Sequence, residues 1–302
     1  RAPKSTSGRA PARTLAAMGR AYESLTPAHV RFIERQRLFF VASAPSDGGH
    51  VNVSPKCGGL AVLSPARVAY ADLSGSGAET AAHALQNGRA TVMLVNLEAG
   101  APLILRMYGR ASLLLARDAP PALLARFPPA LTGDPGFRAV VLLEVDRVQS
   151  SCGYSMPVMS YQRTRTTLTE HAAKEGPRGM AAYRAAKNAY SIDGIPSLAH
   201  LESAEPLRPV RVDGEGRPDP GATGPGFLFG ETAPEGAEGP REALRRRYEE
   251  GRRACEDAIA EACALESEPP RAEAASKGDA SLTAWALPEG SRGVAAAFAA
   301  GA

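Results

Sequence analysis

The chain has 302 residues, of which 44% are hydrophobic and 22% charged, and its formal net charge is +3. This length permits one or two domains with a sizeable core. The near-neutral charge and the aromatic content of 6% give no sign of a nucleic-acid-binding protein. No apolar run is long enough to cross a bilayer. The sequence therefore predicts neither a nucleic-acid partner nor a membrane partner.

The four cysteines and five histidines are dispersed along the chain. They form no CxxC pair and no HExxH motif, so we expect reduced thiols and no metal site. The bend after residue 150 contains Cys152 and a glycine. We interpret Cys152 as a small buried residue rather than a reactive thiol. The cysteines are Cys57, Cys152, Cys255 and Cys263.

Residues 1–17 contain Arg, Lys, Ser and Thr but no acidic residue. This composition is typical of the end of an organelle transit peptide, and equally of a disordered leader. Met18 is then a candidate for the true start of the protein. The compartment stays open: cytoplasmic without a transit peptide, and plastid or mitochondrial with one.

Two helices are predicted close to the first strands. The first covers residues 26–36, where Thr26 can cap the helix and Pro27 suits its first position. The second covers residues 79–86 and ends at Asn87-Gly88, a pair typical of αL helix caps.

Six runs have strand-like composition and are separated by turn residues. Most of them are joined as hairpins, so we expect antiparallel pairing. Alternating β–α–β units are absent, which argues against a doubly wound nucleotide fold. A small closed or half-open barrel would remove bare strand edges. The predicted fold is mainly β with flanking helices. The six runs cover residues 38–45, 50–55, 67–73, 89–97, 103–115 and 139–150.

The chain becomes helical and polar after the last strand. Residues 161–198 predict helix that is broken at Gly176-Pro177, and residues 206–240 are rich in Gly and Pro, as linkers are. Residues 241–265 predict one charged helix, which we interpret as a solvated helix packed on the body or on a partner. A further short helix is predicted at residues 119–131.

Ser74-Gly75-Ser76-Gly77 lies where a strand meets the helix at residues 79–86. Backbone N–H groups at such a place can hold a phosphate. The pattern Ser76-x-x-Glu79 also predicts a capping box, in which Ser76 caps the helix and Glu79 reaches back. Glu79 disfavours a phosphate because like charges repel. The turn by itself leaves both interpretations open.

Two cations near this turn could supply the positive charge that it lacks. Lys56 lies just past the end of one strand, and Arg106 shares one face of another strand with Tyr108 and Arg110, because side chains alternate. The alternative is that Arg106 and Arg110 are ordinary strand residues that face solvent.

Five segments form a pattern that is specific only in combination. They are "MGRAYESLTPAHVRFIERQRLFFVASAP", "HVNVSPKCGG", "VAYADLSGSGAETAAHALQNGRATVMLV", "LRMYGRA" and "DRVQSSCGYSMPVM". Together they resemble the pyridoxamine 5'-phosphate oxidase-like family, and more narrowly its poorly characterised branch of FMN-binding split-barrel proteins. "YRAAKNAYSIDGIPSL" is similar to the C-terminal signature of that branch. The resemblance covers residues 18–198.

The resemblance implies a split β-barrel of about six mostly antiparallel strands, usually a homodimer, with FMN in clefts at the dimer interface. One strand would lie beside the flavin, a second would pass along its ring, the turn would bind its phosphate, and an arginine would reach the phosphate or the ring. The implied cofactor-binding residues are Asn52, Ser54, Lys56, Tyr70, Asp72, Ser74, Ser76, Gly77, Thr80 and Arg106.

The chain departs from the family pattern at the turn. Better-known oxidases of the family carry a basic pair where this chain has Ala78, Glu79 and Thr80. The arginine and histidine that grip the substrate phosphate in those oxidases have no clear match. This departure argues against direct oxidation of pyridoxamine phosphate.

Two functions follow from the resemblance. The first is an FMN-dependent oxidoreductase that acts on an unidentified small molecule, with no dedicated side-chain nucleophile or acid–base pair. Lys56, or a backbone amide near it, would stabilise charge on the ring. The second is a non-enzymatic protein on the same barrel that binds or senses flavin or haem. The substrate and the electron donor cannot be read from the sequence.

We expect four parts and a homodimer. The parts are a leader at residues 1–17, an FMN-binding split-barrel domain at 18–150, a helical segment at 151–200 and a linker with a charged-helix extension at 201–302. The extension is predicted to be dispensable for cofactor binding. The expected dimer face is rich in apolar strand residues, including Val92, Leu94 and Leu105.

Overall fold

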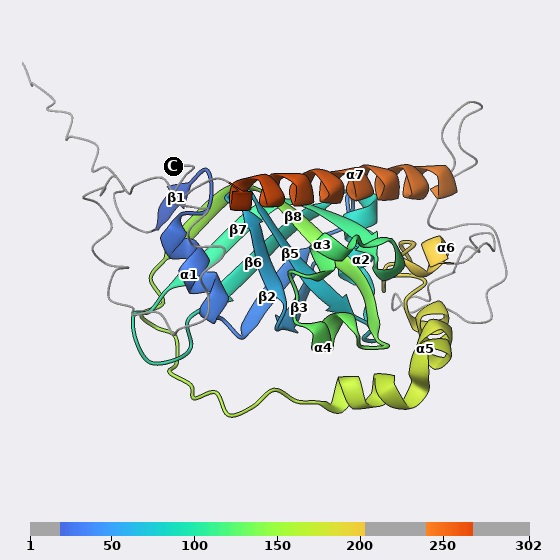
Figure 1. Ribbon diagram of the computed structural model, residues 1–302, viewed down its shortest axis with the longest axis horizontal. Helices are drawn as coiled ribbons and strands as arrows, with labels where there is room; N and C mark the ends of the chain where they lie inside the picture. Colours follow the sequence, from blue (N-terminus) through green and yellow to red (C-terminus); the bar gives the residue numbers. More distant parts are fainter. Residues whose placement is uncertain (1–18, 203–239, 268–302) are drawn as a thin grey trace, which may run out of the picture.

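A curled antiparallel sheet forms the centre of the computed structural model, which describes residues 19–202 and 240–267 (Figure 1). The predicted leader and the Gly/Pro-rich residues 206–239 lie outside the described residues. No helix within the described part of the chain is both long and apolar enough to span a membrane.

The sheet has eight strands in the order β3-β2-β6-β7-β8-β5-β4, with β1 added alongside β8. Every strand pair is antiparallel, as predicted. The two strands beyond the predicted six are β1, which is very short, and β4, which follows β3 across two glycines. The strands are β1 Arg20–Tyr22, β2 Leu38–Ser43, β3 Asn52–Cys57, β4 Leu60–Ser64, β5 Arg67–Leu73, β6 Arg89–Val95, β7 Ile104–Leu115 and β8 Phe137–Ser151.

The barrel is half open. Strands β3 and β4 are the two edges of the sheet, and no ladder joins them in the described residues. The connection Gly58-Gly59 has positive φ at both residues, 67° and 65°, a conformation that glycine adopts without a steric penalty. The mainly β, split-barrel fold is therefore confirmed.

The interior of the barrel is the hydrophobic core. The pleat alternates side chains between the interior and an outer face, and β2, β6 and β7 each direct apolar residues inward. Val92, Leu94 and Leu105 are at most 1% exposed and belong to this core. The prediction that these three residues form a dimer face is wrong, because the pleat turns them inward.

The helix α1, Pro27–Arg35, begins as predicted. Thr26 is its N-cap, its hydroxyl accepts a hydrogen bond from the His29 N–H, and Pro27 holds the first position. The His29 ring Nδ1 lies 3.2 Å from the Thr26 N and completes a reciprocal cap.

The helix α2, Glu79–Gln86, also ends as predicted. The N–H groups of Asn87 and Gly88 both donate to the His83 carbonyl, each at 2.9 Å. Gly88 has φ 74°, the left-handed conformation typical of helix ends.

Prolines break the region between β7 and β8 into short pieces. The single predicted helix is replaced by the 3₁₀ helix η1, Ala116–Asp118, and by α3, Pro121–Leu124, and α4, Pro129–Thr132. The residue before a proline is disfavoured in helical conformation. Pro128 therefore separates α3 from α4.

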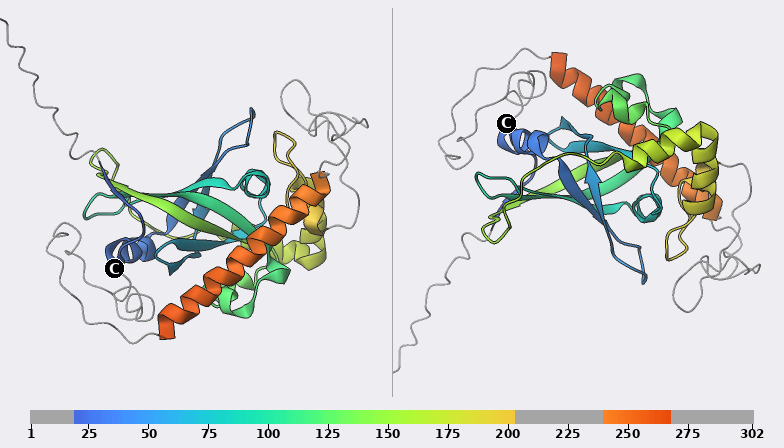
Figure 2. Two further views of the ribbon diagram at one scale, coloured as in Figure 1. Left: turned by 90° about the horizontal axis from the view of Figure 1, so that it is seen from above. Right: turned by 90° about the horizontal axis from the view of Figure 1, so that it is seen from below.

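Residues 152–166 lead away from β8 without helix or strand to α5, Thr167–Lys187. Gly176 has φ 65° and breaks α5 at the predicted Gly-Pro pair. After α6, Ala199–Glu202, the next described element is α7. Figures 1 and 2 place α7 and residues 152–166 on opposite sides of the barrel.

The charged helix α7, Pro240–Ser267, packs along β7 and β4 (Figure 2). Gly251 permits this close approach, because a Cβ there would lie 3.0 Å from the Ser112 Cβ. The Tyr248 hydroxyl accepts a hydrogen bond from the Leu115 N–H and donates to Asp118. The side chains that α7 adds to the core are Leu244, Tyr248, Cys255, Ala258 and Ala262.

Candidate functional site

Most of the predicted cofactor-binding residues meet at one end of the barrel interior. Asn52, Ser54 and Lys56 alternate along β3 toward the interior, because their exposed neighbours Val53 and Pro55 point outward. The side chains of β3 reach across the open edge to β5 and α2. The predicted residues that join this group through contacts are Asn52, Ser54, Lys56, Tyr70, Asp72 and Thr80.

A chain of hydrogen bonds links β3 to α2. The Asn52 side-chain amide donates to the Thr80 hydroxyl at 3.0 Å and to the Ser43 hydroxyl at 3.3 Å. The Ser54 hydroxyl donates to the Asn52 Oδ1 at 3.1 Å. This network holds α2 against the strand edge, so the start of α2 has a fixed position relative to β3.

Asp72 is the centre of a buried charge cluster. Its carboxylate lies 2.6 Å from the Lys56 Nζ and 2.7 Å from the Arg138 Nε. Burial would raise the pKa of Asp72, but the positive charges of Arg138 and Lys56 outweigh burial and lower it from 3.8 to about 2. Two cations and one anion leave one net positive charge beneath the Ser74–Gly77 turn.

Arg138 and Asn188 support that turn from below. Arg138 Nη1 donates to the Gly77 carbonyl at 3.1 Å and to the Asn188 Oδ1 at 2.9 Å. The Asn188 side-chain amide donates in turn to the Gly75 carbonyl at 2.9 Å. The register of β5 against β8 shifts at Arg138, and such bulges re-aim a side chain. The turn is therefore held through its carbonyls.

The N–H groups of the same turn are open. Only the Ser74 N–H has a backbone acceptor, the Gly136 carbonyl at 2.7 Å, while no hydrogen bond joins the N–H groups of Gly75, Ser76 and Gly77 to any described residue. Ala82 is the first residue of α2 whose N–H reaches a carbonyl of the helix start, that of Ala78. The turn thus presents unpaired donors, as helix starts do.

The predicted capping box at Ser76 and Glu79 is wrong. The helix begins at Glu79, its N-cap is Ala78, and no side chain caps it. Ser76 lies two residues before this N-cap position, too far from the helix to act as the cap. Glu79 instead accepts a hydrogen bond from the Ile192 N–H at 3.3 Å, and its other carboxylate oxygen lies beside Gly77.

The turn fits an anionic group, with one opposing charge. The Ser74 hydroxyl is buried and has no partner, the neighbouring N–H groups are unpaired, and the cluster below carries net positive charge. These features suit a phosphate. The Glu79 carboxylate beside Gly77 opposes it, as the sequence predicted. The donors of the turn therefore fit the phosphate of a flavin nucleotide, and the negative charge of Glu79 weakens that fit.

Tyr70 is a core residue. It is 2% exposed, and its ring packs edge-on against Phe39 with centroids 5.4 Å apart. The Lys56 Nζ lies 5.8 Å from the ring centroid. The Tyr70 hydroxyl is buried without a partner, and burial raises its pKa. Only the backbone of β5 at Tyr70, and not its ring, can lie along a ligand.

Arg106 does not join this group within one chain. Lys56 on β3 pairs with Phe39 on β2, which pairs with Leu94 and then with Leu105 on β7. Arg106 is the next residue along β7, so it points to the outer face, away from Lys56. The interpretation that both cations serve the same turn is wrong for a single chain.

The outer face does hold the three polar residues of β7 that the sequence predicts on one face. Arg106 Nη1 donates to the Ser151 hydroxyl at 3.2 Å, and the Tyr108 hydroxyl donates to the Gln149 Oε1 at 3.0 Å. Arg110 donates to the Asn87 carbonyl at 3.1 Å. The shared face of these three residues is confirmed.

Sequence reasoning missed Arg138 and Asn188. Arg138 lies at the start of β8, just before the strand predicted at residues 139–150, and a bulge has no signal in a single sequence. Asn188 lies in the segment "KNAYSIDGIPSL", which contributes to the prediction only through its similarity to the C-terminal signature of the family branch. The same segment carries Asp193, which lies 2.7 Å from the His50 Nδ1.

His83 is a further buried polar residue of the site that the sequence did not single out. Its Nδ1 lies 2.9 Å from the Ser43 hydroxyl, and its Nε2 has no partner. Burial lowers the pKa of His83, while Asp193 and Glu79 partly oppose that effect. The described residues contain no group of three or more His, Cys, Asp or Glu that could hold a metal ion.

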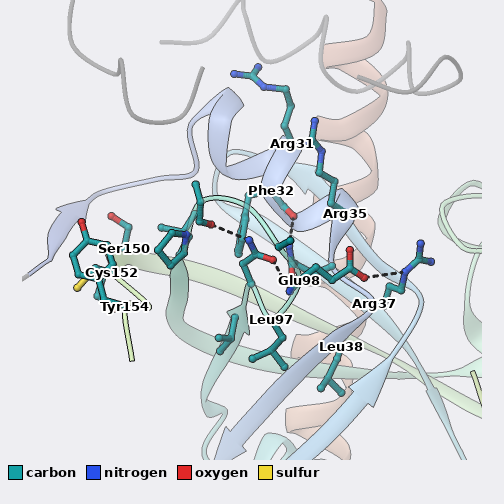
Figure 3. Close-up of a pocket in the computed structure, with 18 of the residues that line it drawn as sticks. Arg31, Phe32, Arg35, Arg37, Leu38, Leu97, Glu98, Ser150, Cys152 and Tyr154 are labelled. Carbon is teal, nitrogen blue, oxygen red and sulfur yellow. Dashed lines mark hydrogen bonds and ion pairs between the residues drawn. The ribbon is translucent and has the colours of Figure 1, made fainter. Parts of the chain in front are cut away.

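A separate cavity of about 610 Å³ opens at the other end of the sheet (Figure 3). It lies between α1, the connection from β6 to β7 and residues 152–161, and none of the predicted cofactor-binding residues lines it. Cys152 lines the cavity and is exposed, so its interpretation as a buried residue is wrong.

Comparison with known proteins agrees with this fold. Residues 25–152 match the family model described as pyridoxamine 5'-phosphate oxidase. The pyridoxamine 5'-phosphate oxidase family protein ustO of Aspergillus flavus is 37% identical in an alignment over 193 residues, and the alignment covers 59% of this chain and 77% of that protein.

Two solved structures are similar at lower identity. HupZ of Group A Streptococcus is 19% identical, with a TM-score of 0.31, over 41% of this chain and 91% of that chain. An FAD-binding protein of Mesorhizobium loti is 17% identical, with a TM-score of 0.32, over 44% of this chain and 96% of that chain. Because the chain is 37% identical to ustO and the alignment covers 77% of that protein, the chain belongs to the pyridoxamine 5'-phosphate oxidase family.

Proposed function

We propose that this protein binds FMN, with the phosphate at the Ser74–Thr80 turn and the ring along the backbone of β3 and β5. The observation that carries the proposal is the turn itself. The N–H groups of Gly75, Ser76 and Gly77 have no acceptor in the described residues, and a buried cluster with one net positive charge supports the turn from below. Such an arrangement attracts and orients a phosphate.

The chain's own residues would have distinct roles. Arg138 and Asn188 hold the turn in shape through its carbonyls, and Ser74 offers a buried hydroxyl without a partner. Lys56 places positive charge at the edge of β3, where it would stabilise negative charge on the ring. Asn52 and Ser54 fix the start of α2 beside it.

We further propose an FMN-dependent oxidoreductase that acts on a small molecule. Bound FMN would supply the redox chemistry, and the protein would supply orientation and electrostatics. The Asp72 carboxylate is paired with both Lys56 and Arg138 and is therefore not placed to act as a general base, which agrees with a site that leaves the chemistry to a cofactor. Pyridoxamine phosphate itself is not proposed as the substrate, because the turn lacks a basic pair and carries Glu79.

A homodimer is also proposed, on a face different from the one expected from the sequence. Val51 and Val53 on the outer side of the β3 edge are 75% and 59% exposed. Exposed apolar surface of this kind marks interaction sites. Light scattering should give the mass of a dimer. A stable monomer that still binds FMN would contradict this part of the proposal.

The experiment is an absorption spectrum of the purified full chain, before and after addition of FMN and NAD(P)H. A flavin spectrum that bleaches with NAD(P)H and recovers in air supports the oxidoreductase. A flavin spectrum that no reductant of this class changes favours the alternative, a non-enzymatic flavin-binding protein. A Soret band without flavin binding would favour a haem-binding protein and would contradict the proposal.

A further inference from the structure

The cavity at the far end of the sheet is the strongest unassigned feature of the structure. We propose that it binds a small organic anion with an aromatic body, independently of the flavin site. Its volume of about 610 Å³ lies within the range of small-molecule sites. The two sites lie at opposite ends of β8, since Arg138 is near its start and Ser150 and Ser151, which line the cavity, are at its end.

The floor and walls of the cavity are apolar and aromatic. In Figure 3, Phe32 descends from α1, Leu38 and Leu97 lie below it, and Tyr154 stands on the opposite side. Tyr161 from the same segment completes the wall. Aromatic rings favour stacked or edge-on contact with another ring, so this open apolar cavity suits a flat aromatic molecule.

The cavity is preformed by contacts that hold residues 152–161 against the barrel. The Met159 N–H donates to the Leu97 carbonyl at 2.6 Å, and the Arg37 guanidinium lies 4.2 Å from the centre of the Tyr161 ring. A wall that is already in place lowers the cost of ordering it when a ligand binds.

The charges around the cavity select an anion. Arg20, Arg31, Arg35 and Arg37 line it, whereas Glu98 is its one acidic lining residue. Arg37 and Glu98 form an ion pair at 3.8 Å, and both side chains are exposed to solvent. Such exposed pairs are weak. A mouth of one dominant sign raises the local concentration of ligands of the opposite sign.

The guanidinium groups lie at the mouth rather than on the floor. Figure 3 shows Arg31 and Arg35 extending from α1 away from Leu38 and Leu97. Glu34 lies on the same helix and interacts electrostatically with Arg31 and Arg35. The arginines around the cavity still outnumber the acidic residues. An apolar floor below a cationic mouth fits a molecule with an aromatic body and one carboxylate or sulfonate.

The test titrates 8-anilinonaphthalene-1-sulfonate into the full chain and follows its fluorescence. We expect saturable binding of one probe per chain that saturating FMN does not displace. Arg31→Glu should weaken binding about fivefold. Arg89→Glu is the matched control, because Arg89 is an exposed arginine at the opposite end of β6 from the cavity, and it should change nothing.

A second variant keeps the test independent of charge. Ala28→Phe should fill part of the cavity from α1 and abolish probe binding, with an unchanged melting curve as the check on folding. Equal weakening by Arg31→Glu and Arg89→Glu would overturn the proposal. So would displacement of the probe by FMN, or equally tight binding of the uncharged N-phenyl-1-naphthylamine.

Discussion

Two sides of the same barrel cover their apolar residues in different ways. On the α7 side, the chain closes its own core with Leu244, Tyr248 and the small residues that follow them. On the side of β3 and residues 154–161, Val51, Val53, Tyr154 and Val158 remain exposed. The chain therefore completes its core by itself on the α7 side and leaves the other side for a ligand or a second chain.

The largest effect should come from removing the self-completed side. Truncation after Glu202 deletes α7, so the side chains it adds to the core are lost and β7 and β4 are uncovered. We expect the melting temperature, measured by circular dichroism, to fall by more than about 10 °C, or folding to fail. Glu249→Gln on the exposed face of α7 is the control. A truncated chain with native melting and FMN binding would restore the sequence-based prediction that this extension is dispensable.

The next largest effect should come from the buried charge cluster. Asp72→Asn leaves Lys56 and Arg138 without their shared carboxylate, and breaking a buried pair in this way costs about 3–5 kcal/mol. Urea unfolding at pH 7 measures this loss. Asp146→Asn, at an exposed position of β8, is the matched control and should be neutral.

The same cluster predicts a pH dependence. The pKa of Asp72 is lowered to about 2 in the folded protein, below its unfolded value of about 3.9. Asp72 therefore stabilises the fold fully above its unfolded pKa, and that stability is lost as the pH falls from about 5 toward 2. The loss should be absent in Asp72→Asn. A variant with the same acid unfolding profile as the wild type would contradict this assignment.

A smaller and more local effect is expected from Asn188. Asn188→Ala removes one hydrogen bond to Arg138 and one to the Gly75 carbonyl. The free energy of unfolding should fall by about 1–3 kcal/mol, and FMN should bind more weakly because the turn loses its support. Asn188→Asp, which keeps the acceptor for Arg138, should recover part of the stability. Unchanged melting and unchanged FMN affinity in Asn188→Ala would show that the turn holds its shape without this residue.

The smallest expected effect is a gain in FMN affinity. Glu79→Gln removes the carboxylate that lies beside Gly77 and that opposes a phosphate. We expect FMN affinity to rise about threefold to tenfold, while riboflavin, which has no phosphate, should bind as before. Fluorescence titration of both flavins measures the difference. An equal change for both flavins would place the phosphate elsewhere.

Local signals predicted the elements well. The cap at Thr26, the end of α2 at Asn87-Gly88 and the break of α5 at Gly176 follow from side-chain and backbone preferences within a few residues. The family resemblance implied Asn52, Lys56 and Asp72 as residues of one site, and the structure brings Lys56 and Asp72 into direct contact and places Asn52 on the same side of β3 as Lys56.

Long-range features were not predictable in the same way. Arg106 was predicted to lie beside Lys56, because the order of the strands in the sheet cannot be read from the sequence. Two strands separate β7 from β3, and the pairing register turns Arg106 and Lys56 to opposite faces. Arg138 depends on a bulge, and Asn188 meets the turn across more than a hundred residues. The capping box failed because α2 begins later than the Ser-x-x-Glu pattern implies.

The central claim is that the Ser74–Thr80 turn holds the phosphate of FMN, and Gly77→Val tests it most directly. The φ of Gly77 is not in the left-handed region, and its nearest obstacle is the movable end of the Glu79 side chain, so the fold should tolerate the change. We expect FMN affinity to fall about tenfold or more, because the valine side chain blocks the approach of the phosphate to the turn, while riboflavin affinity and the melting curve stay unchanged. Equal affinities for both flavins in the wild type, or an equal loss for both in the variant, would contradict it.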